Sequence, residues 1–367
     1  MNQDMQEIID KFDIKGTLKD IQANTEGHIN STFISTFDEQ GIIRKYTHQL
    51  VNGNVFLHPE QVMENIVCVT SHIQQKLRDA NVPDKEQRCL TLVPTKKGTW
   101  YTKDDKQNLW RTYRYITNVR TFQFLEDSES AYRFGGAVGT FQKQLSDFDG
   151  RKLHITIPDF HSMPVRYNQL EQAVAENRAD RLSKVQEELS FLMENKSRGM
   201  LLSQALKSNT VPLRVTHNDT KMNNILFSEI TKEALCVIDL DTVMGGTILF
   251  DTGDMIRTGA TTAAEDERDL SKVTFNLGFF KAMVEGYFEQ ANSFLTPYEK
   301  ELVGESGRTI TQIMAVRFLT DYLNGDVYYH IDRSEHNLDR ARTQLSLMKD
   351  MDRQWEEITH CISRLTV

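Results

Sequence analysis

The segment VTHNDTKMNNILF, residues 215–227, gathers polar side chains between apolar flanks. It contains Asp219, Lys221 and Asn224, and a further carboxylate, Asp239, follows the apolar run CVI. Two carboxylates that lie close together repel each other unless a proton or a cation sits between them. Magnesium is the expected cation, because carboxylate and amide oxygens are hard ligands. The segment therefore predicts a reaction centre rather than a solvated turn.

These residue types suit phosphoryl transfer, in which catalysis rests on positioning and on electrostatic stabilisation. Asp219 would take up the proton of an attacking hydroxyl group, and Lys221 would neutralise charge that develops on the transferred group. Asn224 and Asp239 would hold Mg²⁺ beside the phosphates. If the strands that precede Asp219 and Asp239 pair, their carboxylates meet at one end of a hairpin.

Strand patterns dominate the first third of the chain. Short strands are expected at GTLKDIQ, STFISTF and IIRKYTHQL, with a turn at residues 38–41. A helix is expected from Pro59, because apolar residues recur at spacings of three and four up to Leu77. Strand-like runs return at QRCLTLVP, TWYT and LWRTYRYI, so the sheet should end near Ile116.

Helical periodicity prevails from about Ser130. SAYRFGGAVGTFQKQLSDF should form one helix weakened by its glycines, residues 169–195 form an amphipathic stretch, and residues 296–299 form a capping box. PLRVTH, NILF and ALCVIDL interrupt the helices as short strands. The pattern predicts an α+β fold with a small β domain at 1–118, a hinge near 116–124 and a helical domain at 119–367. A cleft is expected at the hinge.

Composition narrows the functional classes. The net charge of −9 argues against a nucleic-acid binder, which usually carries basic patches. No apolar run approaches the roughly 20 residues of a membrane span, and the N-terminal MNQDMQEIIDKF does not resemble a secretory signal. Four scattered cysteines suit a reducing compartment. We expect a cytoplasmic protein with no membrane or nucleic-acid partner, and no obligate protein partner is visible.

The motif THNDTKMNNILF followed by CVIDLD resembles the catalytic hairpin of the aminoglycoside phosphotransferase and choline kinase superfamily, which shares the protein-kinase-like bilobal fold. Within it, VIDLDTVMGGTILFDTGDMIRTGATTAAEDERDLSKV, RFLTDYLNGDVYY, EGHINSTF and EHNLDRARTQL resemble the bacterial N-acetylhexosamine 1-kinases. The likeness is tightest at 213–273 and 317–345. It implies an ATP- and Mg²⁺-dependent kinase that phosphorylates the anomeric hydroxyl group of N-acetylglucosamine or N-acetylgalactosamine.

The resemblance also implies roles for single residues. Asp219 matches the catalytic aspartate, and Asn224 and Asp239 match the magnesium ligands. Arg317 and Tyr328 match the region that holds the sugar, as does Asp321. On a helix, Arg317 and Asp321 would share one face, and a glycine at 325 would end that helix in a left-handed conformation that turns Tyr328 inward.

The nucleotide loop departs from the protein-kinase pattern. Residues 27–30, Gly-His-Ile-Asn, fall where the phosphate loop of the resembled family lies, and His28 and Asn30 are the predicted nucleotide contacts. The loop keeps one glycine, Gly27, and the position expected for the third-strand lysine is close to Gln49. Lys45, near the start of that strand, receives no role.

Several alternatives stay open at this point. The acceptor could be another sugar, an amino alcohol or an aminoglycoside, and a nucleotide-binding pseudokinase is a further alternative. Asp241 suits a second metal ligand as well as a turn. Structural roles are favoured for His217, which would hold the catalytic loop, and for Asp251 and Asp254. These two would brace that loop or cap the helix after it, with Arg257 pairing one of them.

Overall fold

The computed structural model describes residues 2–24 and 29–366 of the 367-residue chain, so the predicted nucleotide contact His28 lies outside the described residues. The chain forms two compact units. The first comprises Met1–Arg120, Asp147–Pro158 and Leu226–Gly245, and the second comprises Thr121–Ser146, Asp159–Ile225 and Gly246–Val367.

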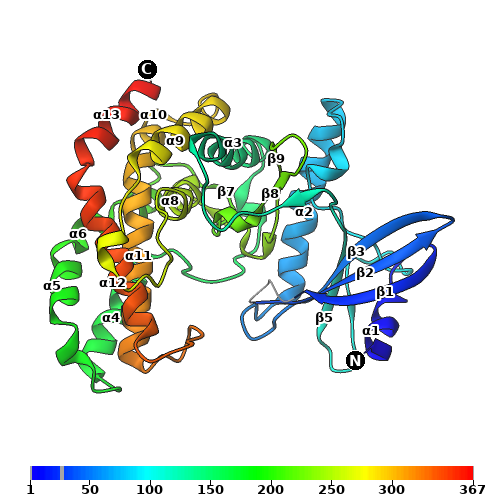
Figure 1. The fold of residues 1–367 in the computed structure, drawn as a ribbon, viewed down its shortest axis with the longest axis horizontal. Coiled ribbons are helices and arrows are strands. Elements are labelled where there is room, and N and C mark those ends of the chain that lie inside the picture. The colour runs from blue at the N-terminus through cyan, green and yellow to red at the C-terminus, as the bar shows by residue number, and fades with distance from the viewer. Residues whose placement is uncertain (1, 25–28, 367) are drawn as a thin grey trace. The chain divides into compact units, whose positions relative to one another are not determined.

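The first unit contains a five-stranded antiparallel sheet in the order β1-β2-β3-β5-β4 (Figure 1). Its strands are β1 (Thr17–Asn24), β2 (Ser31–Glu39), β3 (Ile42–Leu50), β4 (Thr102–Lys103) and β5 (Leu109–Arg114). The turn between β2 and β3 places Gln40 and Gly41 at φ of 54° and 88°. Two positive φ values are what a two-residue hairpin needs to match the twist of its strands. The first three predicted strands and their turn are confirmed.

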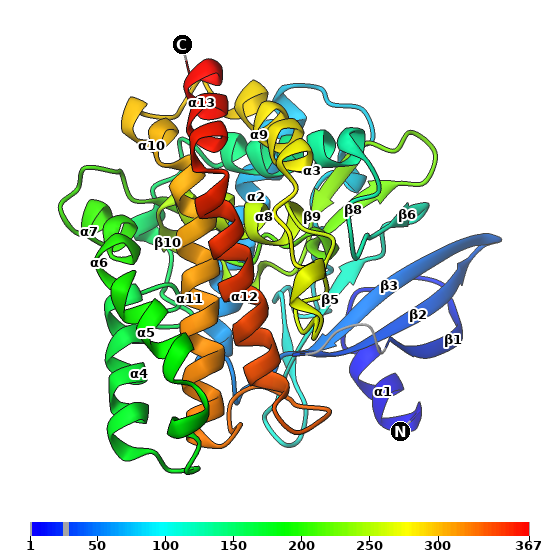
Figure 2. The same ribbon diagram turned by 60° about the vertical axis from the view of Figure 1, so that its left-hand side comes forward.

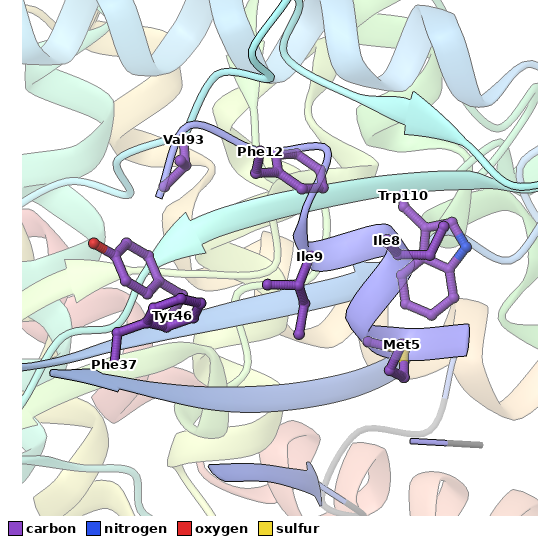
Figure 3. Packing of buried hydrophobic residues seen from close by; sticks show 8 residues of the cluster. All are labelled: Met5, Ile8, Ile9, Phe12, Phe37, Tyr46, Val93 and Trp110. Atoms are coloured by element: carbon purple, nitrogen blue, oxygen red, sulfur yellow. The ribbon is translucent and has the colours of Figure 1, made fainter. Parts of the chain in front are cut away.

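One face of this sheet is apolar. Helix α1 (Asn2–Ile9) and the segment after it contribute Ile9 and Phe12, each 1% exposed, to a cluster that also contains Trp110 of β5 (Figure 3). Phe37 and Tyr46 close the same cluster with their rings edge to face, at a centroid separation of 5.7 Å. Because side chains alternate along a strand, the residues next in sequence point to the opposite face. That face carries the polar side chains considered below.

Helix α2 (Pro59–Asp79) begins at the predicted proline and buries the predicted apolar stripe from Val62 to Leu77, which confirms it. The short 3-10 turn η1 (Lys85–Gln87) follows. The predicted strand QRCLTLVP is wrong. Its backbone reaches β5 through hydrogen bonds from Val93 N to Thr112 O and from Arg114 N to Thr91 O, with one isolated bridge, which is short of a regular ladder.

A second sheet in the first unit has the order β6-β8-β9. Its strands are β6 (Val119–Arg120), β8 (Ile225–Ser228) and β9 (Ala234–Val237); the 3-10 turns η2 (Gly150–Lys152) and η5 (Leu240–Thr242) also belong to this unit. The predicted pairing of the strands before Asp219 and Asp239 is wrong. β9 pairs within this sheet, whereas β7 (Arg214–Thr216) belongs to a separate two-stranded sheet. Strand β10 (Met244–Gly246) crosses the sequence boundary between the units.

Helices build the second unit, and α11 and α12 run side by side within it (Figure 2). Its helices are α3 (Ser128–Gln144), α4 (Met163–Glu176), α5 (Gln186–Glu194), α6 (Lys196–Gly199), α7 (Leu201–Lys207), α8 (Ile248–Gly259), α9 (Leu277–Ala291), α10 (Pro297–Glu301), α11 (Val303–Asn324), α12 (His336–Arg353) and α13 (Trp355–Leu365), with 3-10 turns η3 (Leu182–Lys184), η4 (Met222–Asn224) and η6 (Leu270–Lys272). Within the described residues, no helix has the length and apolar character needed to cross a membrane.

The capping box at α10 is confirmed, since Thr296 and Glu299 each bond the other's backbone nitrogen. The continuous stretch expected at 169–195 is instead broken into α4 and α5. Asn177, with φ of 40°, ends α4 in the left-handed conformation that asparagine tolerates.

The glycines of α3 allow a close helix contact rather than merely weakening the helix. A Cβ added at Gly135 would lie 1.8 Å from Met283 O of α9, and one at Gly286 would lie 2.0 Å from Tyr132 O. At Gly136 the nearest such atom is Gly286 O at 3.7 Å, an ordinary contact. Neighbouring glycines in one helix therefore differ in what they do.

Gly135→Ala should destabilise the protein by roughly 1–3 kcal/mol, because overpacking forces α3 and α9 apart. Gly136→Ala is the matched control and should be neutral or stabilising by up to about 1 kcal/mol through helix propensity. Urea denaturation followed by circular dichroism measures both. Equal denaturation midpoints for the two variants would contradict the close contact.

Candidate active site

The predicted catalytic loop lies in the second unit, between β7 and the 3-10 turn η4. Asn218 adopts φ of 69°, a left-handed conformation that asparagine accepts more readily than most residues. The turn directs Asp219 and Lys221 out of the strand, and η4 returns Asn224 toward them. The structure thus brings these three predicted residues together.

Asp219 receives contacts on one side of its carboxylate. Lys221 Nζ lies 3.1 Å from Asp219 Oδ2, and Asn224 Nδ2 donates to the same oxygen at 2.9 Å. Burial opposes ionisation, but the charge of Lys221 and these hydrogen bonds outweigh it and hold the pKa of Asp219 below its ordinary value. Oδ1 accepts no hydrogen bond from the described residues, so the charged carboxylate keeps one oxygen for a ligand.

Asp251, in the first turn of α8, holds the loop through three hydrogen bonds. Its Oδ2 accepts from His217 N at 3.0 Å and its Oδ1 accepts from Asn218 N at 2.7 Å, while Thr220 Oγ1 donates to its carbonyl oxygen at 2.6 Å. Burial raises the pKa of Asp251, against the hydrogen bonds that stabilise its charge. Asp219 N also donates to His217 Nδ1 at 3.2 Å. The loop-holding interpretations of Asp251 and His217 are confirmed.

Asp254 lies one helical turn further along α8. It pairs with Arg257 at 2.8 Å, as expected, and Arg257 also reaches Glu265 at 3.0 Å. Asp254 Oδ2 is buried without a hydrogen-bond partner among the described residues. Burial, with a contribution from the charge of Asp219, raises the pKa of Asp254. The electrostatic link to Asp219 is one that the sequence interpretation missed.

His161 supports the loop from the segment before α4, and sequence reasoning missed it. Its Nε2 lies 2.9 Å from Asn218 O, so this nitrogen must carry the hydrogen and donate it to the carbonyl. Burial lowers the pKa of His161 to about 3, so the ring stays neutral. The segment is far in sequence from the motif, and a single histidine before a helix gives no signal on its own.

A cavity of about 340 Å³ in the second unit is lined by all three predicted sugar-binding residues, Arg317, Asp321 and Tyr328, together with Arg166 and Tyr329. His161 connects this cavity to the predicted catalytic loop. It bonds to Asn218 of the loop, and its ring lies 4.6 Å, centroid to centroid, from the ring of Phe160. The Arg317 guanidinium in turn lies 5.2 Å from the centre of the Phe160 ring.

Two arginines face this cavity without an acidic partner. Arg317 Nη1 contacts Met314 Sδ at 3.7 Å, and its guanidinium lies 5.8 Å and 5.5 Å from the ring centres of Tyr328 and Tyr329. Arg166 donates to backbone oxygens of the preceding loop, and its Nε is buried without a partner among the described residues. Burial and the neighbouring charge of Arg317 lower the pKa of Arg166. Neither arginine forms an ion pair with a carboxylate of the described residues.

Asp321 is engaged in a way that the sequence did not predict. Its Oδ1 accepts from the backbone nitrogens of Val327 and Tyr328 at 3.0 and 2.8 Å. Its Oδ2 accepts from Tyr329 N and from Asn337 Nδ2, both at 2.9 Å. A carboxylate has about four acceptor sites, so no site is left for the expected direct contact with a sugar. Asp321 instead shapes the loop that carries Tyr328.

The remaining predicted residues belong to the first unit. Asn30 Nδ2 donates to Asp241 Oδ2 at 2.6 Å. Asp239, at the start of η5, adopts a left-handed φ of 62°. Lys45 Nζ lies 5.8 Å from the centre of the Tyr115 ring, a surface contact consistent with its having no assigned role. Asp241, whose role the sequence left open, is bonded to Arg111 through both carboxylate oxygens.

Asn224 offers an oxygen donor of the kind that a nucleotide-bound Mg²⁺ takes. No group of three or more His, Cys, Asp or Glu side chains within the described ranges could hold a metal ion by itself. Mg²⁺ typically uses one or two carboxylates and completes its shell with water and phosphate oxygens. Asn224 uses its amide nitrogen for Asp219, and its side-chain oxygen accepts no hydrogen bond from the described residues, so a hard oxygen donor is available there.

Comparisons with known proteins show the family and the fold of the chain. The sequence model of the phosphotransferase enzyme family matches residues 77–279, more than half of the chain. A microcompartment-associated aminopropanol kinase shares the fold with a TM-score of 0.62 at 12% identity, over 98% of this chain and 99% of that chain. An aminoglycoside phosphotransferase from Alicyclobacillus acidocaldarius matches with a TM-score of 0.58 at 13% identity, over 98% and 94%.

A spectinomycin phosphotransferase solved in complex with ADP and spectinomycin matches with a TM-score of 0.55 at 12% identity, over 94% of this chain and 97% of that chain. At these identities the likenesses bear on the fold alone. They confirm the predicted class, an antiparallel β part and a larger helical part of the protein-kinase-like kind.

Asp251→Asn should loosen the loop, because one of its two bonded oxygens becomes an amide nitrogen that cannot accept. Loss of a charge-assisted hydrogen bond costs about 1.5–3 kcal/mol, so hydrogen exchange at the amides of His217 and Asn218 should quicken by at least about 10-fold. Asp254→Asn is the control, since Asp254 does not bond these amides. Unchanged protection of both amides in Asp251→Asn would refute the bracing role.

Proposed function

The chain belongs to the phosphotransferase enzyme family, and from that premise we propose that it is an ATP- and Mg²⁺-dependent kinase acting on the anomeric hydroxyl group of an N-acetylhexosamine, N-acetylglucosamine or N-acetylgalactosamine. The proposal combines three supports: a base with a free oxygen, hard oxygen donors for a nucleotide-bound metal, and a cavity whose charge suits an uncharged acceptor. The anomeric position rests on the sequence resemblance.

Asp219 acts as the base in this proposal. The acceptor oxygen attacks the γ-phosphorus, the bond to the bridging oxygen of ADP breaks, and the acceptor proton passes to Asp219 Oδ1. The lowered pKa of Asp219 makes it a weak base. A weak base is sufficient in a loose transition state, where the hydroxyl proton is transferred late and positioning contributes most of the catalysis. Lys221, 3.1 Å from Asp219, supplies positive charge where the phosphoryl group passes.

Asn224 and Asp239 are the proposed protein ligands of the metal. When bound, Mg²⁺ would neutralise the phosphate oxygens and stabilise the ADP leaving group. Asn224 is already oriented by its bonds to Asp219, so the metal ligand and the base are fixed as a pair. The bound ADP in the spectinomycin phosphotransferase and in an aminoglycoside phosphotransferase of the same fold supports a nucleotide as the phosphoryl donor.

The charge of the acceptor cavity is the observation that carries the choice of substrate. Solved structures of this fold include kinases for aminopropanol and ethanolamine and phosphotransferases for aminoglycosides, whose acceptors are amines. An ammonium group 4 Å from one guanidinium would be repelled by about 4 kcal/mol at an effective dielectric constant of 20. Here Arg166 and Arg317 both face the cavity, so a cationic acceptor is disfavoured.

The cavity's own carboxylates offset this charge only in part. Glu176 is paired with Arg178 at 2.6 Å, and Asp321 is bonded to neutral donors of the loop after α11 and of α12, so the three arginines of the lining exceed its two carboxylates by one positive charge. Guanidinium groups and the Tyr329 hydroxyl, which is buried without a partner among the described residues, instead donate to neutral oxygens. Ring hydroxyls and an acetamido carbonyl are such acceptors. An N-acetylated sugar therefore suits the cavity better than an amino alcohol or an aminoglycoside.

ADP release in a coupled assay with Mg-ATP tests the function. The wild type should turn over an N-acetylhexosamine and lose activity with chelator. Asp219→Asn should lower turnover by roughly 10²–10⁴-fold, because it keeps the size of the side chain but removes proton acceptance, while nucleotide affinity changes little. No ADP release with any acceptor would favour the pseudokinase alternative, and more than half of wild-type turnover in Asp219→Asn would remove the base assignment.

An acceptor panel tests the cavity. N-acetylglucosamine and N-acetylgalactosamine should be used better than glucosamine, aminopropanol, ethanolamine or an aminoglycoside. Arg317→Ala and Arg166→Ala should each raise the KM for the sugar by about 10-fold or more, as expected when buried polar groups lose their partner, with nucleotide affinity intact. Arg268→Ala, at an exposed position in the same unit, is the control. Preference for an amine acceptor would leave the kinase class standing and refute the sugar.

A further inference from the structure

The first unit contains a buried arginine, Arg111, next to the position near Gln49 at which a protein kinase would carry the lysine of its third strand. Gln49 of β3 stands opposite Arg111 of β5 in the antiparallel register. Arg111 is 1% exposed and is among the largest fully buried side chains of the described chain. It lies on the face of the sheet opposite the apolar cluster of Figure 3, in which its neighbour Trp110 is packed. Neither Gln49 nor Arg111 was assigned a role from the sequence.

Arg111 commits its donors to two partners. Its Nε and Nη2 both donate to Gln49 Oε1, at 3.0 and 2.9 Å. Its Nη1 donates to Asp241 Oδ1, and its Nη2 donates to Asp241 Oδ2 at 2.9 Å. The planar fork of an arginine can bridge an amide and a carboxylate in this way, whereas a lysine ammonium is a single point of charge. Gln49 is held in turn by its bond to Thr32 Oγ1 at 3.3 Å.

Asp241 connects this arginine to the loop before β2. Its Oδ2 also accepts from Asn30 Nδ2 at 2.6 Å, and Asn30 Oδ1 accepts from Asn52 N at 3.0 Å. The Asp241 side chain is 2% exposed, so its charge is compensated inside the protein. The same short segment is tied to α2, because Asn65 Nδ2 donates to Val243 O at 2.9 Å.

These contacts argue against the second-metal reading of Asp241. Three N–H groups, two from Arg111 and one from Asn30, already occupy its two oxygens. A divalent cation on the same carboxylate would displace donors and would face the positive charge of Arg111. Removing either partner would leave a buried charge unpaired, which is strongly destabilising. The carboxylate is therefore an internal counter-ion.

We infer that Arg111, Asp241 and Asn30 form one positioning unit for the nucleotide: Arg111 and Asp241 hold the side chain of Asn30, without binding phosphate or metal themselves. In this arrangement a buried arginine on β5 takes the place of a lysine on β3, and it positions Asn30 rather than contacting the ligand. The inference rests on the proposed function for two points, that the first unit binds a nucleotide and that Asn30 contacts it.

The test is a mutant cycle read by the affinity for Mg-ADP in calorimetry, which needs no acceptor. Asn30→Ala and Asp241→Asn should each weaken binding by about 10-fold, the effect of roughly one hydrogen bond to a charged group. Because Asn30 is held through Asp241, the double variant should also lose about 10-fold rather than about 100-fold. Asn54→Ala, at an exposed asparagine of the same unit, should bind as the wild type does.

Two further variants keep the test decisive. If Asp241→Asn does not fold, Arg111→Gln/Asp241→Asn removes both buried charges, and Asn30→Ala should have no further effect in that background. Arg111→Lys keeps the charge but loses the fork, and it should weaken nucleotide binding as Asp241→Asn does. The Mg²⁺ concentration for half-maximal activity should be unchanged in Asp241→Asn and raised in Asp239→Ala.

Additive effects of Asn30→Ala and Asp241→Asn, wild-type affinity in either variant, or a raised Mg²⁺ requirement in Asp241→Asn would each overturn the inference. Nucleotide binding without turnover of any acceptor would refute the kinase function and leave this cycle measurable. Turnover with additive effects would refute only the positioning unit.

Discussion

The conformation of the predicted catalytic loop depends on one buried carboxylate. Asp251 has no exposed surface, and desolvation of its charge is unfavourable unless the charge is hydrogen-bonded. The backbone nitrogens of His217 and Asn218 supply those bonds, and in return they hold a turn in which Asn218 is left-handed. Since α8 carries Asp251 and is packed on α11, the position of Asp219 is set by the helical core rather than by the loop itself.

Around that loop, positively charged side chains of the second unit lie in two places. Lys221 lies beside Asp219 and favours its carboxylate form. The guanidinium groups of Arg166 and Arg317, which form no ion pair with a carboxylate of the described residues, lie instead at the cavity of the second unit. Between these regions stands His161, which is kept neutral by burial and adds no charge of its own. A neutral side chain thus connects the loop of Asp219 to the residues around the cavity.

The structural features that were predicted correctly from the sequence are determined by residues close together in the sequence. The β2–β3 turn, the apolar stripe of α2, the capping box of α10 and the helix end at Gly325, with φ of 92°, all depend on neighbours within a few residues. The motif at residues 215–227, whose catalytic role stays a prediction, was recognised for the same reason. The pairing of β7, the support from His161 and the engagement of Asp321 were missed, because each depends on a partner that tertiary folding brings from another element.

The residues that the sequence analysis missed have one cause in common: each interacts with a partner that is far away in sequence. Arg111 and Asp241 are 130 positions apart in sequence, so neither position signals a buried ion pair when it is read alone. A buried charge is tolerated only where the fold places a partner that pairs and hydrogen-bonds with it, and no local sequence pattern indicates which residue that partner is. Arg166 and Arg317 show the converse. They are only partly buried and lack carboxylate partners among the described residues, so their N–H groups can donate to the oxygens of a ligand. Charges that are paired inside the protein thus hold the fold together, and the unpaired guanidinium groups are the ones that the proposed sugar would contact.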